Sequence, residues 1–287
     1  MPRGGFSGNK QKEDERVSQR LLCSTGTLIG RPNGRDWRLL APCRERLSCD
    51  GLEFMMYDTW YDRWEEVAAF VGGLGLPVVT MHCEKRVGEE ISLGEEEKAL
   101  EHFEINCRMA ALLKAGLMVL HLWNGVPSDR HIERNIAAFG QLREKAEKYG
   151  LQLTVENVVC SQNDPLTHWR ALIREYPDIL FTFDTKMAAF HGQLNALYEP
   201  ENRDLWPHIA HLHVNDYGGG YRDWEHLQTL HPGEGNVDFE RLFAFLREIG
   251  YDGDYTVEAT SFTPDGVIHW DKLNQTLRCL RGLMGRG

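Results

Sequence analysis

The most constraining feature of this sequence is an alternation of short β-type runs with longer amphipathic runs along most of the chain. Strands are expected at eight places: Leu21–Ser24, Gly51–Met56, Pro77–Cys83, Met118–Trp123, Leu151–Val158, Ile179–Asp184, Ile209–Val214 and Asp254–Ala259. Strands that alternate with helices form parallel sheets joined by right-handed crossovers. Eight such strands are the number that closes a (β/α)8 barrel.

The runs between the strands carry apolar residues at the three- and four-residue spacing of amphipathic helices. Helices are expected at Trp60–Gly75, Glu95–Ala115, His131–Tyr149, Pro165–Tyr176, Asp238–Gly250 and Asp271–Leu283. Gly116, Gly150 and Gly250 follow such runs, where a left-handed helix cap costs glycine little. An open doubly wound sheet is the alternative, but no G-x-G-x-x-G follows the first strand. We therefore predict an α/β chain that forms a single (β/α)8 TIM barrel.

The length of the chain fits one such barrel. It has 287 residues, and a barrel of this kind needs about 250. Residues 1–20 are rich in Gly, Lys, Glu, Arg and Gln without apolar periodicity, which predicts a mobile N-terminal tail. The barrel domain is expected to span residues 21–287.

Charge and composition exclude several classes of partner. The chain has 32 Lys and Arg against 43 Asp and Glu, a net charge of −11, so its surface field should repel nucleic acid. It has no apolar run of the roughly 20 residues that span a bilayer and no signal-peptide core, so no membrane association is expected. The seven cysteines form no C-x-x-C pair, which fits reduced thiols and a cytoplasmic location. A homo-oligomer is compatible with all of this.

Polar residues recur on one face of the expected strands. Side chains alternate along a strand, so Val155 should pack outward while Thr154 and Glu156 point into the barrel. The same alternation places these polar residues inward near the strand ends: Thr80, His82, His121, Thr182, Asp184, His211, His213, Thr256 and Glu258. Active sites of such barrels lie at the C-terminal ends of the strands, so one site is expected to collect them.

The inward carboxylates predict a metal ion. Glu156, Asp184 and Glu258 cannot be buried together as ions unless a positive charge offsets the cost of removing them from water. Carboxylates with one imidazole and open water positions suit a single divalent ion, Mn²⁺, Mg²⁺, Co²⁺ or Zn²⁺. A purely structural hydrogen-bond network is the alternative.

Five short segments in order carry a family resemblance: Thr154-Val-Glu-Asn157, Thr182-Phe-Asp-Thr185, His211-Leu-His-Val-Asn-Asp216, His231-Pro-Gly-Glu-Gly235 and Thr256-Val-Glu-Ala259. With these segments the chain resembles the sugar phosphate isomerase/epimerase superfamily, the xylose-isomerase-like barrels that include the AP endonuclease 2-like family. The resemblance implies that Glu156, Asp184, His213 and Glu258 are the metal ligands. It also implies that Glu156 and Glu258 are the catalytic acid/base pair, which would meet a flat sugar from two sides.

The chain departs from parts of this pattern. Many relatives carry a His where Met187 stands, which speaks against the trinuclear site of the three-zinc endonucleases. Ketose 3-epimerases carry an Arg shortly after the strand-seven His, whereas this chain has Tyr217-Gly-Gly-Gly220 and reaches an arginine only at Arg222. The candidates for substrate binding are His82, His121, Trp123, Lys186 and Arg222. For Trp123 the alternative is core packing, and for Lys186 it is a solvated loop.

The loop 216–237 is long for a barrel of this kind and is expected to form a lid. Within it, the glycine amides of His231–Gly235 look like a phosphate site, but the resemblance implies a supporting turn. An unphosphorylated polyol or keto acid is therefore favoured as substrate. The predicted function is a metal-dependent isomerase or epimerase of a small keto sugar or related polyol that abstracts a proton α to a carbonyl. The alternatives are a dehydratase of the inosose or 3-dehydroshikimate type, and a non-catalytic ligand-binding subunit.

Overall fold

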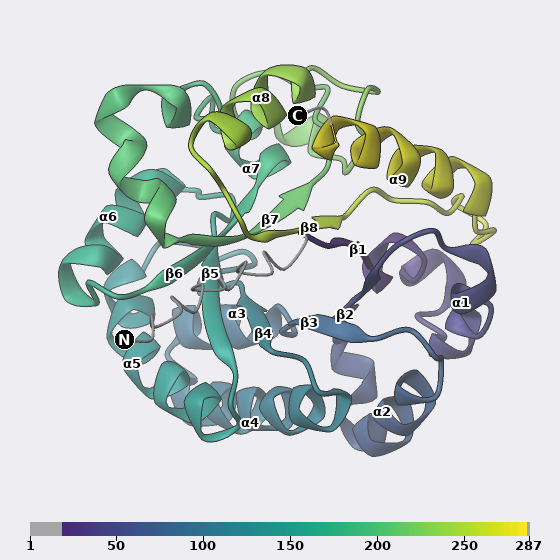
Figure 1. Ribbon diagram of the computed structural model, residues 1–287. Helices are drawn as coiled ribbons and strands as arrows, with labels where there is room; N and C mark the ends of the chain where they lie inside the picture. The colour runs from purple at the N-terminus through teal and green to yellow at the C-terminus, as the bar shows by residue number, and fades with distance from the viewer. Residues whose placement is uncertain (1–18, 286–287) are drawn as a thin grey trace, which may run out of the picture.

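The strands pair in chain order, and the last returns to the first, so that the sheet closes into a parallel barrel (Figure 1). This is a computed structural model that describes residues 19–285. The strands are β1 (Leu21–Ser24), β2 (Gly51–Met55), β3 (Val78–His82), β4 (Leu117–Leu120), β5 (Gln152–Glu156), β6 (Leu180–Asp184), β7 (Ile209–Val214) and β8 (Asp254–Val257). The predicted (β/α)8 barrel is confirmed.

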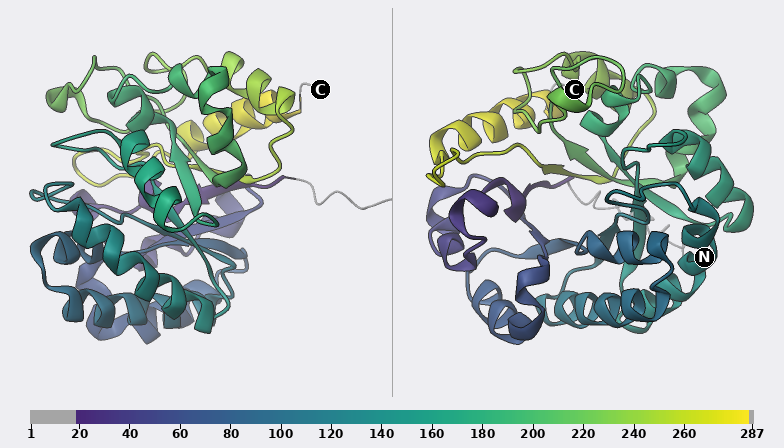
Figure 2. Two further views of the ribbon diagram at one scale, coloured as in Figure 1. Left: turned by 90° about the vertical axis from the view of Figure 1, so that its left-hand side faces the viewer. Right: turned by 180° about the vertical axis from the view of Figure 1, so that it is seen from behind.

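Helices surround the strands on the outside of the barrel (Figures 1 and 2; Figure 2 gives two further views). The α-helices are α1 (Cys43–Arg46), α2 (Trp64–Gly72), α3 (Arg86–Leu93), α4 (Glu96–Leu113), α5 (Ile132–Lys148), α6 (Pro165–Glu175), α7 (Thr185–Phe190), α8 (Phe239–Glu248) and α9 (Trp270–Met284). The 3-10 helices are η1 (Thr25–Thr27), η2 (Arg31–Asn33), η3 (Trp37–Leu40), η4 (Asp58–Arg63), η5 (Ala196–Tyr198), η6 (Pro200–His208) and η7 (Trp224–His226).

Two details differ from the sequence-based expectation. The short helices α1, α3 and α7 were not predicted, because periodicity cannot assign a run of four to eight residues. Gly150 and Gly250 have the expected left-handed backbone, with φ of 72° and 68°. Gly116 does not, because α4 ends earlier and Lys114 takes the left-handed position instead, with φ of 59°.

The outward faces of the strands form the core with the helices. Phe181 of β6 stacks on Trp169 of α6, with ring centroids 4.2 Å apart, and Tyr255 of β8 stacks on Phe243 of α8 at 5.2 Å. Burial of such large apolar surfaces is the main stabilising term in a fold of this size. The helices thereby fix the direction in which the opposite faces of the strands point.

The inward faces form a polar layer in the barrel interior. Thr154 Oγ1 lies 2.7 Å from Thr182 Oγ1, and His211 Nε2 lies 2.9 Å from Thr256 Oγ1. These pairs are buried and join neighbouring strands, which confirms the predicted alternation. The next inward residue on each strand lies one layer closer to the C-terminal mouth.

Most of the predicted tail, residues 1–20, lies outside the described residues. Its last two residues contact β8 and the loop before it: Gln19 Nε2 donates to the carbonyl of Tyr251 in that loop, and Arg20 pairs with Asp254 of β8 at 2.6 Å. Within residues 19–285, no helix has the length and apolar character needed to cross a membrane.

Candidate metal centre and active site

Four side chains converge at the C-terminal mouth of the barrel. Glu156, Asp184 and His213 stand at or near the ends of β5, β6 and β7, and Glu258 follows β8 directly. One ligand atom from each lies within 4.8 Å of the others. His213 Nδ1 lies 3.3 Å from Glu156 Oε1, 3.5 Å from Glu258 Oε2 and 3.9 Å from Asp184 Oδ2. This group, which we call the four-ligand cluster, can hold a metal ion.

The burial and the missing hydrogen bonds of its carboxylates are typical of a site that binds a cation. Glu156 and Asp184 are fully buried, and Glu258 Oε1 is buried without a hydrogen-bond partner. Burial, opposed by the charge of Lys186 and reinforced by that of Glu156, raises the pKa of Asp184 to about 6. A divalent ion would offset this crowding of negative charge, and Glu258 could bind it through Oε2, the oxygen that faces His213.

His213 is oriented by a carboxylate that the sequence analysis did not single out. Glu53 Oε2 lies 3.1 Å from His213 Nε2 and 3.2 Å from His211 Nε2, and it accepts a hydrogen bond from Thr80 Oγ1 at 3.0 Å. Burial alone would lower the pKa of His213, but the carboxylates around it outweigh burial and raise that pKa well above its usual value. The contact with Glu53 leaves Nδ1 of His213 facing the other three ligands.

A signal for Glu53 was present in the sequence. It alternates with Leu52 and Phe54 in the second expected strand, and the alternation that identified Glu156 also points Glu53 inward. Its side chain is completely buried in the polar layer. The position of this acidic residue in an otherwise apolar strand was therefore sufficient to predict that Glu53 points into the barrel.

Two asparagines, also not predicted, hold Asp184 in place. Asn215 Nδ2 donates to Asp184 Oδ2 at 2.7 Å, and the Asp184 amide donates to Asn157 Oδ1 at 2.6 Å. The other oxygen, Oδ1, accepts from the amide of Met187 at 2.8 Å and so caps the start of α7. Both asparagines lie in the segments that carry the family resemblance, directly after Glu156 and two residues after His213.

The two predicted histidines of β3 and β4 contact a carboxylate of the four-ligand cluster. His82 Nε2 and His121 Nε2 lie 3.2 Å and 2.8 Å from Glu156 Oε2. Both histidines are buried. Burial would raise the pKa of Glu156, but the charges of His121 and His213 outweigh it and hold that pKa well below its usual value.

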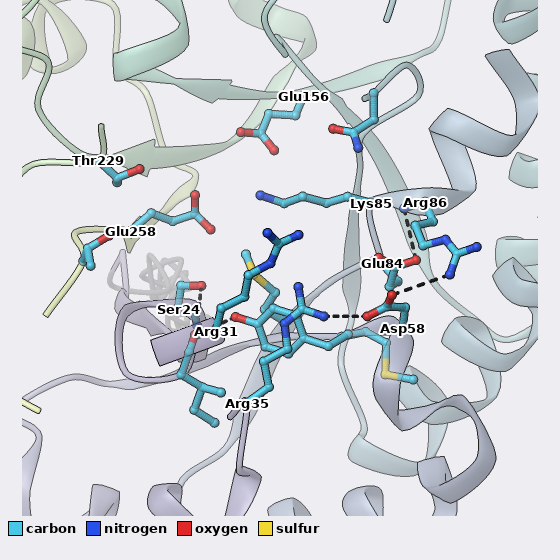
Figure 3. A pocket seen from close by; sticks show the side chains of 18 of the residues that line it. Ser24, Arg31, Arg35, Asp58, Glu84, Lys85, Arg86, Glu156, Thr229 and Glu258 are labelled. Atoms are coloured by element: carbon cyan, nitrogen blue, oxygen red, sulfur yellow. Dashed lines mark hydrogen bonds and ion pairs between the residues drawn. The ribbon is translucent and has the colours of Figure 1, made fainter. Parts of the chain in front are cut away.

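A cavity of about 480 Å³ opens over the cluster, and Glu156 and Glu258 both line it (Figure 3). The segments after β1, β2 and β3 form much of its wall. Those after β1 and β3 contribute basic residues: Arg31, Arg35, Lys85 and Arg86. Lys186, a predicted substrate-binding residue, also lines the cavity, and its Nζ donates to Thr229 Oγ1 at 2.9 Å. The arginines and Lys85 were missed because they lie in loops and short helices without periodicity.

The four other predicted substrate-binding residues are absent from the cavity lining: His82, His121, Trp123 and Arg222. Trp123 is completely buried in the core and donates its indole N–H to the carbonyl of Val158 at 3.2 Å, which is the packing alternative. Arg222 Nη2 donates to the carbonyls of Cys160 and Ser161 and so anchors its own loop. Their placement as substrate contacts is not supported by this geometry.

The turn at His231–Gly235 supports the loop, as the resemblance implied. The amides of Gly233 and Gly235 both donate to Asp216 Oδ2, at 2.8 Å and 3.0 Å. Asp216 Oδ1 accepts from the amides of Tyr217 and Val237. The glycine amides are thus occupied by a carboxylate of the chain and do not form a phosphate site.

A separate buried group consists of Asp129, Cys160 and His168. Asp129 Oδ1 accepts from the amides of Ser161 and Gln162, and Oδ2 lies 2.9 Å from His168 Nε2. Its oxygens are therefore already satisfied by donors of the chain. We interpret this group as an anchor between the loops after β4 and β5.

Comparison with known proteins decides the family. Residues 45–283 match the family described as xylose isomerase-like TIM barrel. The chain belongs to this family. A curated relative is an uncharacterised protein of Methanocaldococcus jannaschii, 29% identical over 150 residues, and the matched part is 48% of this chain and 46% of that protein. The aligned region thus spans about half the length of the curated relative.

Solved structures share the fold of this xylose isomerase-like barrel at low identity. The 3-keto-D-glucoside 4-epimerase of E. coli is 20% identical with a TM-score of 0.63, and the alignment covers 92% of this chain and 100% of that one. D-Psicose 3-epimerase of Clostridium cellulolyticum, solved with D-tagatose, is 12% identical with a TM-score of 0.68 and coverage of 92% and 99%. The IolI protein with a bound zinc atom is 14% identical with a TM-score of 0.67 and coverage of 93% and 98%.

Proposed function

We propose that this xylose isomerase-like barrel is a metal-dependent isomerase or epimerase of a small keto sugar or related polyol. The observation that carries the proposal is that Glu156 and Glu258 border one cavity and belong to one cluster able to bind a metal ion. Two carboxylates on separate strands can remove a proton from a carbon α to a carbonyl and return it. The epimerases and the zinc-bound protein among its structural neighbours support this reading.

Glu156, Asp184, His213 and Glu258 would hold one divalent ion, Mn²⁺, Mg²⁺, Co²⁺ or Zn²⁺. When bound, such an ion polarises substrate oxygens and stabilises the negative charge that develops on them. The residues of the chain then have to position the substrate and move the proton.

Glu258 is the better placed proton acceptor of the pair. Its Oε1 makes no hydrogen bond to the chain, and its side chain retains 12% exposure beside the cavity. Glu156 has both oxygens engaged, Oε1 with His213 and Oε2 with His82 and His121. We therefore assign Glu258 to proton removal and Glu156, which the two histidines hold in place, to proton return.

Lys186 is placed to orient the substrate. Its ammonium group is buried at the cavity wall and donates to a neutral hydroxyl of Thr229 rather than to a carboxylate. A buried ammonium with a weak acceptor can gain a substrate oxygen as a further partner at little cost. We therefore propose Lys186 as a substrate-binding residue, whereas His82 and His121 act behind Glu156, which they contact.

The test is proton exchange at the substrate carbon. Protein loaded with Mn²⁺ or Zn²⁺ is incubated in D2O with a panel of ketoses, inososes and keto acids, and deuterium uptake and product are followed by NMR. Deuterium uptake with a rearranged sugar is expected. Loss of water would instead assign the dehydratase alternative, and binding without any exchange would assign the non-catalytic one.

A further inference from the structure

We infer that the substrate carries an anionic group, a carboxylate or a phosphate, and that Arg31 and Lys85 bind this group. The inference rests on the proposed function, because it names the class of substrate for the same cavity. Arg31 begins η2 in the loop after β1, and Lys85 precedes α3 after β3. Both line the cavity that Glu156 and Glu258 border.

These two side chains point into the cavity. Figure 3 shows the guanidinium of Arg31 and the ammonium of Lys85 extending into the space between the wall and the two glutamates. Among residues 19–285, neither has a hydrogen-bond or ion-pair partner for its charged group. Lys85 is half-buried, so part of its hydration is already lost.

Two neighbouring arginines on the same wall already have an ion-pair partner. Arg35 Nη1 lies 2.5 Å from Asp58 Oδ1, and Arg86 Nη1 lies 3.5 Å from Asp58 Oδ2. These two arginines share one carboxylate and are held against the wall. Arg31 and Lys85 have no such carboxylate, although the chain as a whole carries a net charge of −11.

The acidic residues of this wall do not neutralise the pair. Glu84 directs Oε2 to the backbone amide of Arg86 at 3.0 Å, and burial raises its pKa to about 7, so it carries only part of a charge at neutral pH. Glu89 lies one helical turn after Lys85 and forms no ion pair with it. The two free cations therefore remain available to a ligand.

The chemistry of the pair fits one acidic group. An arginine fork binds a carboxylate or phosphate through two parallel hydrogen bonds, and a lysine adds a point charge. Because the four-ligand cluster is at the floor, the carbonyl and hydroxyls of the substrate would face Glu156 and Glu258 while its acidic group faces Arg31 and Lys85. A keto sugar acid or a keto sugar phosphate has both features.

The experiment measures binding and not turnover. Calorimetric titrations of the Mn²⁺-loaded protein use three six-carbon keto compounds: neutral D-fructose, 5-keto-D-gluconate with a carboxylate, and D-fructose 6-phosphate. At least one acidic compound is expected to bind ten times or more tightly than D-fructose, and the one that does identifies the group. Lys85→Gln and Arg31→Gln should each reduce that preference by about tenfold, as expected for a charge-assisted hydrogen bond.

Controls separate this preference from direct binding of anions to the metal. The two variants keep the four ligands, so their Mn²⁺ affinity should equal that of the parent, and Lys148→Ala removes an exposed cation that does not line the cavity. No preference for either acid, or a preference that survives loss of both cations, overturns the inference. Deuterium exchange on neutral sugars with a KM no higher than that for either acid would overturn it while leaving the proposed function intact. Tight binding of an acid without exchange would do the reverse.

Discussion

His213 Nε2 lies 3.1 Å from Glu53 Oε2, so a carboxylate from β2 fixes the orientation of a candidate metal ligand on β7. The same oxygen also lies 3.2 Å from His211, which stands two residues earlier on β7. A carboxylate behind a ligating imidazole fixes which ring nitrogen carries the proton and raises the basicity of the other. Glu53 therefore belongs to the proposed metal centre although it does not face the cavity.

Glu53→Gln should weaken Mn²⁺ or Zn²⁺ binding by about 10- to 100-fold, because it removes the charge that orients His213. Calorimetric titration of metal into chelator-treated protein measures this. Thr154→Val is the matched control, since it removes a hydroxyl from the same polar layer without touching His213. Equal metal affinity in the parent and in Glu53→Gln would mean that Glu53 is only an interior structural group.

The protein is expected to bind about one divalent ion per chain in the four-ligand cluster. Removing the ion with a chelator should lower the melting temperature, because binding at 100 times the dissociation constant contributes about 2.7 kcal/mol. Elemental analysis and melting curves with and without added metal measure both effects. Absence of metal together with an unchanged melting temperature contradicts the assignment. Three tightly bound zinc ions would show that further groups, such as His82 with His121 and Glu156, also bind metal.

Glu258→Gln and Glu156→Gln should each keep the fold and part of the metal but reduce turnover by roughly 10²- to 10⁴-fold, since each removes a proton carrier. Because Glu258 has the free oxygen, Glu258→Gln should abolish deuterium uptake from D2O. Glu156→Gln should retain more uptake while losing inverted product. A metal-loaded variant that turns over at the parent rate would identify its glutamate as a ligand or bystander.

The raised pKa of Glu84 predicts that the free energy of unfolding depends on pH. Burial raises its pKa to about 7 in the folded protein, above the ordinary value of about 4.3. Between these two values the unfolded chain releases a proton that the folded protein keeps, so this contribution to stability is complete below about pH 4 and is lost as the pH rises to 7. Relative to Glu84→Gln, the parent should lose at most about 1.4 kcal/mol per pH unit in that window. Urea unfolding of both proteins at pH 5, 6, 7 and 8 measures the difference, and parallel curves would contradict the prediction.

Asp129 should matter for stability and not for metal binding. Its carboxylate accepts hydrogen bonds from the amides of Ser161, Gln162 and Asn163, and His168 contacts it as well. Asp129→Ala leaves these donors unsatisfied and should cost roughly 2–4 kcal/mol of unfolding free energy. Denaturant unfolding measures the cost, and metal titration of the folded variant serves as the control. A stable variant that has lost metal would mean that the Asp129 group binds an ion itself.

Part of the site was predictable because a strand has a strict two-residue period. The apolar outward residues Val155 and Phe181 made the inward direction of Glu156 and Asp184 readable from the sequence, and the same rule would have found Glu53. Arg31 and Lys85 follow no period, since each lies in a loop or at a helix start. Nothing in their local sequence indicated that they meet in one cavity.

The sequence by itself determined the barrel and its strand boundaries to within a few residues, because alternation and helical periodicity are local properties of a chain. The four residues proposed to bind metal came from the family resemblance of the segments that contain them. Only the tertiary structure decided which side chains face one another. It placed Glu53 behind His213 and left Arg31 and Lys85 without partners at the cavity wall. Of the predicted substrate-binding residues, it placed only Lys186 in the cavity lining. Contacts between residues far apart in the chain depend on how the closed barrel brings its loops together. A local sequence pattern contains no information on the distance between two such loops.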